Sequence, residues 1–502
     1  MILLKYQKYI IVVLGLFLLG CDSEKKSESP VLVRVDDQYI TRDEFISRSE
    51  YTIRPEWCRG ENYVHRKIAL NSLIAEKLLA IEAGLNTPID NDPDIHAYLK
   101  GRKEQEMRQL NYQRTAVDKV TLNQETLNTV LENSERTYQV EIIPIGDDGA
   151  AAQIGRDLAA QNITFSEIKE KINGSGGTIQ DLELRFDSPL DDVVYKALFH
   201  NKNIQKGQVI GPLQLDENAY TLVRINGWSR RPLLSSQDQK LRLKDIREKE
   251  TRVAAMDIYV DWVRKLMHSK RLDFNKDVLI SLIKAVGPIY FEAREKSDIK
   301  MQKNFWNIEN KDHINIKDVA DKVDALKSEP LLEIDGQVWT VGRFEEELKI
   351  HPLVFRNPKM SKRQFGEQFR LAIADMVRDR YITAYAYDKE YDKDKRLQHQ
   401  YKMWVDNLKA EYMREKYLAN AGLENKNDYN TVHQALDPYI KDLFRKYSKQ
   451  IEINTDLFES TKLTDIDVLV IQENVSFPVY VPNFPRLTTY DRLDYGRILE
   501  EE

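Results

Sequence analysis

Cysteine is scarce in this chain of 502 residues, with Cys21 and Cys58 the only two. A framework of several disulfides is therefore excluded, but the 42% of hydrophobic residues can build cores for two to four domains. The eight histidines are scattered and form no His-Glu-x-x-His pattern, so the sequence predicts no metal site. It also lacks Gly-x-Ser-x-Gly and phosphate-loop motifs, and we expect no cofactor.

Excess positive charge and long apolar segments are lacking as well. Acidic residues outnumber basic ones by 81 to 75, which argues against a nucleic-acid partner. Beyond the first twenty residues no segment approaches eighteen consecutive apolar residues, so no spanning helix is expected there. Asp90, Asp92 and Asp94 imitate the start of a calcium loop, but Ile95 and Gly101 stand where its glycine and closing glutamate belong.

The N-terminus has the pattern of an export signal at residues 1–20. Lys5 and Lys8 precede an apolar run that is too short to cross a bilayer comfortably. The following LLGC sequence resembles the lipobox of bacterial lipoproteins, which implies cleavage before Cys21 and a lipid on its thiol. The polar stretch 21–31 has the composition of a tether. We therefore expect a periplasm-facing envelope lipoprotein, in the inner or the outer membrane. The alternative is an uncleaved anchor with an incidental cysteine.

A hairpin followed by a helix is predicted at the start of a module that spans 32–134. The sequence VLVRVDDQYI reads as two short strands joined at Asp36-Asp37. Thr41 is then placed to cap a helix, with Glu44 three residues later.

Two longer helices are predicted in the rest of this module. Apolar residues recur at helical spacing through 64–85, and Gly84 is placed to end that helix. The segment 94–120 reads as an exposed, charged helix of a bundle. Cys58 has no disulfide partner if Cys21 is acylated, and we interpret it as a core residue rather than a reactive thiol.

The first hairpin is repeated late in the chain, at LLEIDGQVWTVGRF, with an offset of 335 − 36 = 299. A later helical segment matches at an offset of 376 − 73 = 303, which four extra loop residues reconcile. We therefore expect a second module at 331–450. The identical positions are Asp335, Gln337, Thr340 and Phe344, which align with Asp36, Gln38, Thr41 and Phe45.

The remaining chain divides into three parts. Segment 137–228 mixes strands, glycines and short helices, and a long helix opens the connector 236–330. That helix carries an apolar stripe that we interpret as a core seam. The last part, 451–502, contains a strand at 466–471 and a Pro- and Tyr-rich tail that we expect to form an extended strap. The stripe residues are Ile246, Val253, Met256, Val260 and Leu266.

Two stretches resemble a known family. VDDQYITRDEF and LIAEKLLAIEAGL resemble the hairpin and first long helix of periplasmic foldases of the SurA and PrsA kind. From Tyr138 the order of elements resembles the parvulin family of peptidyl-prolyl isomerases: VEIIPI, two helices, a Gly176-Gly177 turn, FDSPLDDVVYKALF, GQVIGPLQL and YTLVRI. The resemblance implies an α+β protein in which mostly helical chaperone modules with short hairpins flank a parvulin-like α/β domain.

The parvulin resemblance also locates a degenerate pocket. Ile142 and Thr221 occupy the strand positions where parvulins place two histidines, and Ile179-Gln180 replaces a leucine-glycine pair. Phe199 matches the pocket aromatic, and Phe186 lies near the shelf that holds the proline ring. The apolar positions thus survive while the hydrogen-bonded floor is lost. For Phe186 and Phe199, plain domain core is the alternative.

The resemblance implies a membrane-anchored foldase or chaperone that binds unfolded exported or outer-membrane proteins through apolar surfaces. Whether it is an enzyme is left open, because an active peptidyl-prolyl isomerase is the first alternative. The second is a structural lipoprotein subunit of an envelope assembly or secretion machine, with a fixed membrane-protein partner. We expect contact with the membrane through lipid only.

Overall fold

The computed structural model describes residues 29–174, 179–216, 219–303, 323–357, 360–424, 426–464 and 479–499. About 58% of the chain is helical and its sheets are small, which agrees with the predicted α+β class. Among the described helices none is both long and apolar enough to cross a membrane. Cys21, the Gly176-Gly177 turn and the predicted strand at 466–471 lie outside the described residues. The described chain forms two compact units, one made of 112–262 and the other of 29–111 and 263–499.

The first unit is built on a four-stranded antiparallel sheet with the order β4-β3-β6-β5. In chain order its elements are η2 (Val117–Lys119), α5 (Gln124–Ser134), β3 (Arg136–Ile145), α6 (Asp148–Ala159), α7 (Phe165–Gly174), β4 (Gln180–Leu184), α8 (Asp192–Phe199), β5 (Val209–Asp216), β6 (Ala219–Arg230) and most of α9 (Ser236–Met267).

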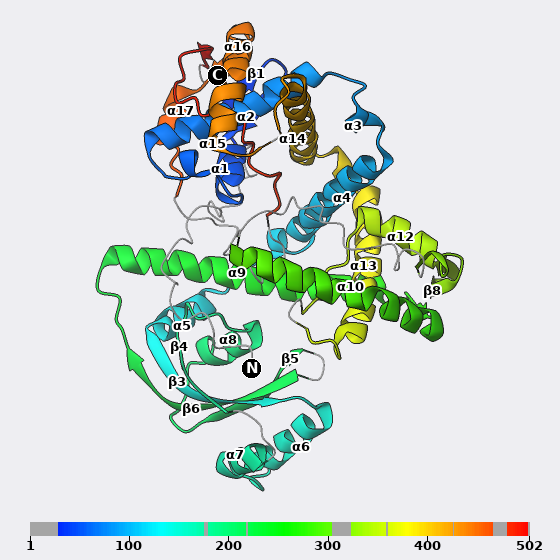
Figure 1. Cartoon of the computed structure of the whole chain (residues 1–502). Helices are drawn as coiled ribbons and strands as arrows, with labels where there is room; N and C mark the ends of the chain where they lie inside the picture. Colours follow the sequence, from blue (N-terminus) through cyan, green and yellow to red (C-terminus); the bar gives the residue numbers. More distant parts are fainter. Residues whose placement is uncertain are drawn as a thin grey trace. The chain divides into compact units, whose positions relative to one another are not determined.

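Helices cover both faces of this sheet. Side chains from α6 and α7 pack on one face, whereas α5, α8 and α9 cover the other (Figure 1). Ile246 and Val253 of α9 are buried in that second core, as the predicted seam requires. Val260 was wrongly placed in the seam: its side chain is 46% exposed, and Tyr259 is buried instead. A straight helix has 3.6 residues per turn, so residues chosen at a spacing of seven gradually move around the helix. Over about 20 residues such a stripe leaves the face that the core covers.

The second unit contains both predicted hairpins, each followed by a helix. The first consists of β1 (Val31–Val35), β2 (Gln38–Thr41) and α1 (Arg42–Glu50), and the second of β8 (Pro330–Ile334), β9 (Gln337–Thr340) and α12 (Val341–Ile350).

The two hairpins agree in detail. Asp36 and Asp335 both have a positive φ in the turn, at 55° and 48°. Thr41 and Thr340 both cap the following helix, accepting the main-chain N–H of Glu44 (3.0 Å) and Arg343 (3.3 Å). The predicted repeat is therefore present as repeated local structure.

Each hairpin pairs with a short third strand that the sequence analysis did not find. In the first module β10 (Ile451–Ile453) pairs antiparallel with β1, and Glu452 lies opposite Arg34. In the second, β7 (Leu272–Phe274) pairs antiparallel with β8, and Asp273 lies opposite Glu333. Because Arg34 and Glu333 differ by the hairpin offset of 299, the two third strands have the same register.

The residues after the third strands also correspond. Asn454 caps α17 (Thr455–Ser460) through its side chain, and its main-chain N–H donates to the carbonyl of Leu32. Asn275 stands at the start of α10 (Lys276–Lys303), and its N–H donates to the carbonyl of Leu331. The repeat thus extends to a strand, a capping asparagine and a helix.

In chain order each copy of the repeat runs from hairpin to third strand, but in space the copies exchange these strands. The hairpin at 31–41 pairs with the strand at 451–453, and the hairpin at 330–340 pairs with the strand at 272–274. The first module is consequently closed by the C-terminal part of the chain. Figure 1 shows this as blue α1 and α2 (Tyr63–Ala83) beside orange α16 (Asp437–Lys446).

The long helices are exchanged in the same way. In the first module α2 (Tyr63–Ala83) packs against α14 (Lys395–Asn420). Across the repeat, α4 (Pro93–Thr115) contacts α13 (Phe365–Asp388), where Arg108 donates to Thr383 over 2.9 Å. The remaining elements are η1 (Glu56–Cys58), α3 (Pro88–Asn91), η3 (Tyr391–Lys393), α15 (Tyr429–Thr431), η4 (Val432–Leu436), α16 (Asp437–Lys446) and β11 (Arg497–Ile498).

The core of the first module contains residues that the predicted boundaries assigned to the second module, 331–450. Ala410 of α14 and Ile440 of α16 pack with residues of α1 and α2, because the exchanged helices bring them there. Helix α2 ends at Gly84, as predicted, but all of 68–80 is buried rather than one stripe. Cys58 is fully buried in the same core.

The tail was predicted as an extended strap; its described part, 479–499, contains no helix and a single short strand, β11. Phe484 and Leu487 are buried in the core of the first module. Between Ala421 and residue 450 the chain is largely helical.

Candidate functional site

The structure brings the four predicted pocket residues to one face of the sheet in the first unit. Ile142 lies opposite Val223, and Thr221 lies opposite Pro144, so Ile142, Thr221 and Val223 share a face. Val223 packs in the same core as Phe186 and Phe199, and Ile142 packs against that core. The residues that the parvulin resemblance singles out are therefore neighbours in the fold.

The two phenylalanines are core residues rather than the walls of an open groove. Phe199 is fully buried and Phe186 is 5% exposed. Their ring centroids lie 6.0 Å apart in an edge-to-face arrangement, and Tyr195 stacks on Phe199 at 5.4 Å. Such pairs add about 0.5–1.5 kcal/mol each beyond their buried area. The structure thus favours the core alternative for both.

The floor positions offer little hydrogen-bonding capacity. Thr221 is 3% exposed, and its hydroxyl donates to the main-chain carbonyl of Ile143 over 3.4 Å. Ile142 carries only an aliphatic side chain. Neither residue can act as a general acid or base near neutral pH, so these positions supply no proton-transfer group.

Sequence reasoning missed a polar cluster that α9 adds to this core. The Lys249 ammonium donates to the carbonyl of Phe186 over 2.8 Å and lies 4.1 Å from the centre of the Tyr195 ring. Burial lowers the pKa of Lys249 to about 8, and the nearby Arg252 adds to the effect. This side chain therefore loses charge more readily than an ordinary lysine.

Glu250, the next residue of α9, connects α9 to α8 and to the residue that follows α8. Its carboxylate accepts a hydrogen bond from the Tyr195 hydroxyl at 2.6 Å and lies 3.0 Å from His200 Nε2. Burial alone would raise the pKa of Glu250, but the contacts with His200 and Tyr195 outweigh it and the pKa is lowered. The helical stripe gave no sign of these groups because they flank its apolar residues.

A second polar cluster lies in the first module, where α1, α2 and α14 meet. Arg48 donates two hydrogen bonds to Glu76, of 2.7 and 2.8 Å. Lys77 lies 3.0 Å from Asp406 and 3.3 Å from Glu44. All five side chains are at most 5% exposed. We call these five residues the ion cluster.

Further contacts connect the ion cluster to its surroundings. His399 Nε2 lies 2.7 Å from Glu44 and its ring stacks on Tyr39 at 4.3 Å. The main-chain carbonyl of Asn483, in the tail, accepts a hydrogen bond of 2.9 Å from Arg48. Burial alone would raise the pKa of Glu44, but Lys77 and His399 lower it to about 2.

The ion cluster fixes how these helices pack. Burying each charge costs several kcal/mol, and only close, well-oriented partners offset that cost. A shift of one helix past another would separate the partners, so the cluster favours a single register of α1, α2 and α14. It contains no exposed group that could meet a ligand, and we assign it a structural role.

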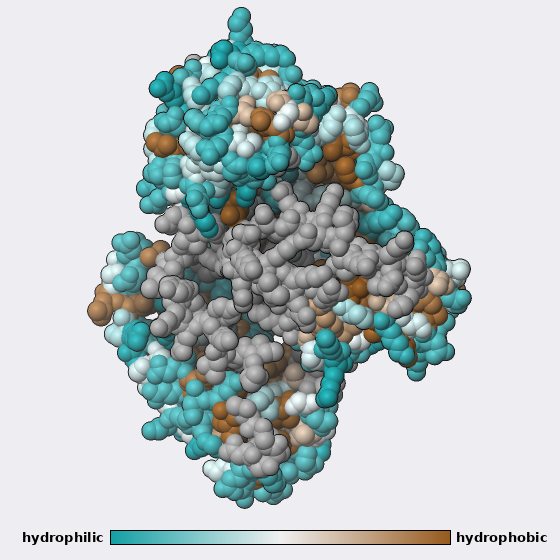
Figure 2. Space-filling model, in the orientation of Figure 1, coloured by the Kyte–Doolittle hydropathy of each residue, from teal (hydrophilic) through white to brown (hydrophobic). Residues whose placement is uncertain are grey.

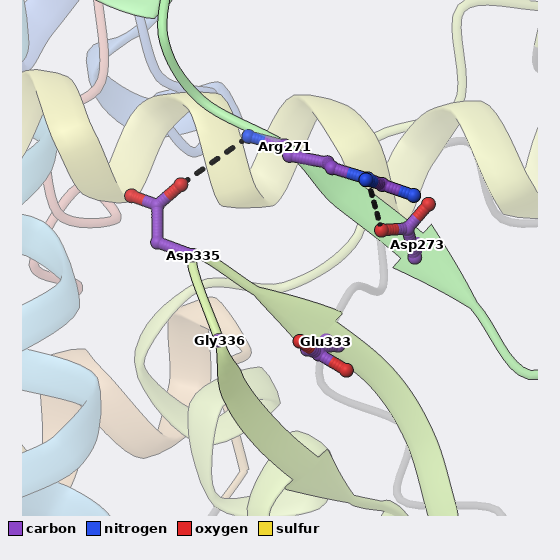
Figure 3. Close-up of a pocket in the computed structure, with 5 residues that line it drawn as sticks. All are labelled: Arg271, Asp273, Glu333, Asp335 and Gly336. Atoms are coloured by element: carbon purple, nitrogen blue, oxygen red, sulfur yellow. Dashed lines mark hydrogen bonds and ion pairs between the residues drawn. The ribbon is translucent and has the colours of Figure 1, made fainter.

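Two surface hollows lie in the second unit. A depression of about 220 Å³ lies beside β7 and β8, and Figure 3 shows Arg271 there between Asp335 and Asp273. A larger one, of about 580 Å³, lies beside the C-terminal end of α14 and is lined by Tyr417 and Leu423 among others. On the face drawn in Figure 2 apolar side chains occur in small separate groups on a largely hydrophilic surface.

Among the described residues no group of three or more His, Cys, Asp or Glu side chains could hold a metal ion. Comparison with known proteins gave no matching family model, no matching curated protein and no matching solved structure.

Proposed function

We propose that the protein is a lipid-anchored foldase or holdase of the bacterial cell envelope. It binds extended segments of unfolded exported or outer-membrane proteins, and its parvulin-like domain has lost isomerase activity. In this proposal Cys21 carries the lipid.

The observation that supports this proposal most is the order of elements in the first unit. A strand, two helices, a second strand, a helix and two further strands follow one another in the order of the parvulin resemblance. They form an antiparallel sheet in which the first and last strands, β3 and β6, are central neighbours. Ile142 and Thr221 stand on these two strands, where the resemblance places two histidines.

The chemistry of that face argues against catalysis. An isomerase must lower the barrier to rotation of an X-Pro bond, which is about 18–20 kcal/mol, within a pocket that holds the proline ring. Phe199 is fully buried and the Thr221 hydroxyl is engaged by main chain, so this face presents neither an open aromatic shelf nor a free polar floor. Binding of extended segments needs only apolar area and main-chain hydrogen bonds.

The repeated modules support the same proposal. Each has a small sheet and long helices, as the resemblance to foldase chaperone modules implies.

The test uses the full chain extracted in detergent. A denatured outer-membrane protein is diluted into buffer with and without it, and aggregation is followed by light scattering. We expect suppression near equimolar ratio. Absence of suppression at a several-fold excess would contradict the proposal and favour a structural subunit.

A companion assay measures proline isomerisation in a short peptide. The proposal expects the uncatalysed rate. Clear acceleration that persists in Thr221→Val would show an active isomerase and overturn our reading of the pocket.

A further inference from the structure

The repeat allows one module to be compared with the other at the same place in the sheet. Strands β10 and β7 are equivalent: each pairs antiparallel with the first strand of a hairpin, in the same register. In both strands, alternate residues direct their main-chain N–H and C=O groups toward the hairpin. The residues between them direct these groups outward, away from the hairpin. The outward residues are Ile451 and Ile453 in β10, and Leu272 and Phe274 in β7.

In the first module the outward edge is occupied. Strand β11 pairs parallel with β10, so that Arg497 lies beside Glu452 and Ile498 beside Ile453. The N–H of Leu499 donates to the carbonyl of Ile453 over 3.0 Å. A charged pair of 2.9 Å joins Arg497 to Glu452.

In the second module the equivalent edge is bare within the described part of the chain. The sheet order is β7-β8-β9, which leaves β7 at its end. The outward main-chain groups of Leu272 and Phe274 have no hydrogen-bond partner among the described residues. An unpaired edge of this kind is a template for one more strand.

The charges along this edge differ from those of the first module. Where Arg34 faces Glu452, the second module has Glu333 facing Asp273 across the strands. Like charges directly opposite each other destabilise a sheet. Arg271 pairs with Asp273 at 2.6 Å, but both side chains are exposed, and Glu333 has no ion pair among the described residues. Figure 3 shows the two carboxylates beside one depression.

We propose that the outer edge of β7 is a docking site for an extended segment of another polypeptide, which adds as a parallel strand. The segment carries a basic residue beside Asp273 and Glu333, and an apolar residue next to it beside Phe274. We identify this segment with the unfolded client of the proposed function. The choice of occupant therefore rests on that function, whereas the unpaired edge of β7 does not.

The first module defines the requirements on the segment. The residue after the apolar one must donate its N–H to the carbonyl of Phe274, as Leu499 donates to Ile453, and so cannot be proline. The residue before the basic one corresponds to Gly496, which has a φ of +82°. A Cβ there would lie 2.9 Å from the carbonyl oxygen of Ile451, so glycine is favoured at this position.

The probe is therefore a labelled peptide with the sequence DRLDYGRIL, which copies residues 491–499. Its binding to the full chain in detergent is followed by fluorescence anisotropy. Two matched peptides serve as controls, one with glutamate in place of the arginine that precedes isoleucine, and one with an N-methyl group on the last leucine. We expect each control peptide to bind at least tenfold more weakly, because one loses the charge pair and the other the main-chain hydrogen bond.

Protein variants then locate the site. Asp273→Lys combined with Glu333→Lys should weaken binding of the probe at least tenfold. The matched control, Asp388→Lys with Asp442→Lys, has the same change in net charge at exposed carboxylates and should bind the probe unchanged. Circular dichroism checks that each variant is folded.

The proposal is overturned if the probe does not bind saturably, if the N-methylated peptide binds as well as the probe, or if the Asp273 and Glu333 variant binds normally. It is also overturned if the protein dimerises in sedimentation and this variant abolishes the dimer, because the occupant is then a second copy. Probe binding without suppression of client aggregation refutes the proposed function alone. Suppression without probe binding refutes the edge alone.

Discussion

Lys77→Met should destabilise the packing of α2 by about 3–5 kcal/mol. The Lys77 side chain is 2% exposed and lies within 3.3 Å of both Glu44 and Asp406. Methionine fills most of the same volume, so the change removes a charge rather than creating a large cavity. It leaves buried carboxylates without their shared cation, and breaking a buried ion pair on one side costs about this much.

Native-state hydrogen exchange measures the effect locally, which suits a chain of several modules. A loss of 3 kcal/mol corresponds to roughly 150-fold faster exchange of the α2 amides, since about 1.4 kcal/mol is a factor of ten. The matched control is Lys393→Met. Lys393 and its partner Glu390 are about two thirds exposed, so this change should cost at most about 1 kcal/mol.

A second variant separates charge from packing. Lys77→Met combined with Asp406→Leu removes one of the stranded carboxylates, while Glu44 keeps its contact with His399. We expect this double variant to exchange more slowly than Lys77→Met alone. Exchange that is less than tenfold faster in Lys77→Met, or costs that simply add in the double variant, would refute the electrostatic reasoning.

Three further outcomes are expected. Glu44 has its pKa lowered from 4.5 to about 2, so its contribution to stability is complete above pH 4.5 and is lost as the pH falls to 2; acid titration of unfolding should show this window, and Glu44→Gln should flatten it. Burial raises the pKa of Cys58 to about 12, so iodoacetamide followed by mass spectrometry should label this thiol only after unfolding. Gly101→Ala should loosen α12 by about 1–3 kcal/mol in hydrogen exchange, because its Cβ would lie 2.0 Å from the carbonyl oxygen of Ile350, whereas Gly146→Ala meets no atom within 4 Å and should be neutral.

Local signals in the sequence were sufficient for the hairpins and their caps. The Asp-containing turns and the capping threonines Thr41 and Thr340 interact only with residues a few positions away, so their patterns can be recognised in the sequence alone. Gly84 ends α2 for the same reason, with a φ of 65° that favours glycine.

The exchange of third strands could not be predicted in this way. The strands IEI and LDF are three residues long, too short for a period of two to be distinguished. Their partners lie far away in the chain, and nothing local in Ile451 or Leu272 indicates which hairpin they join. A repeated signal was available in Asn275 and Asn454, each followed two residues later by an aspartate, but this match lies outside the hairpin alignment.

The candidate site shows the same limit. The parvulin resemblance placed Ile142 and Thr221 on the first and last strands, and the structure has them on β3 and β6, with Phe199 in the core on the same face. Burial of Phe199 depends on α8 and α9 covering that face, which periodicity alone does not reveal. Nothing in the helical pattern of α2 indicates that the charged Glu76 and Lys77 are buried, yet α14 and the tail cover them.

The exchanged strands also set the order in which the modules can be completed as the chain emerges from its N-terminus. The second hairpin appears 330 − 274 = 56 residues after its partner strand, so its sheet can close at once. Strand β1, by contrast, is made 451 − 35 = 416 residues before β10, and longer still before β11. Until then the edge of β1 and the core around α2 are uncovered, and the N-terminal module is the last to mature although it is the first to be made.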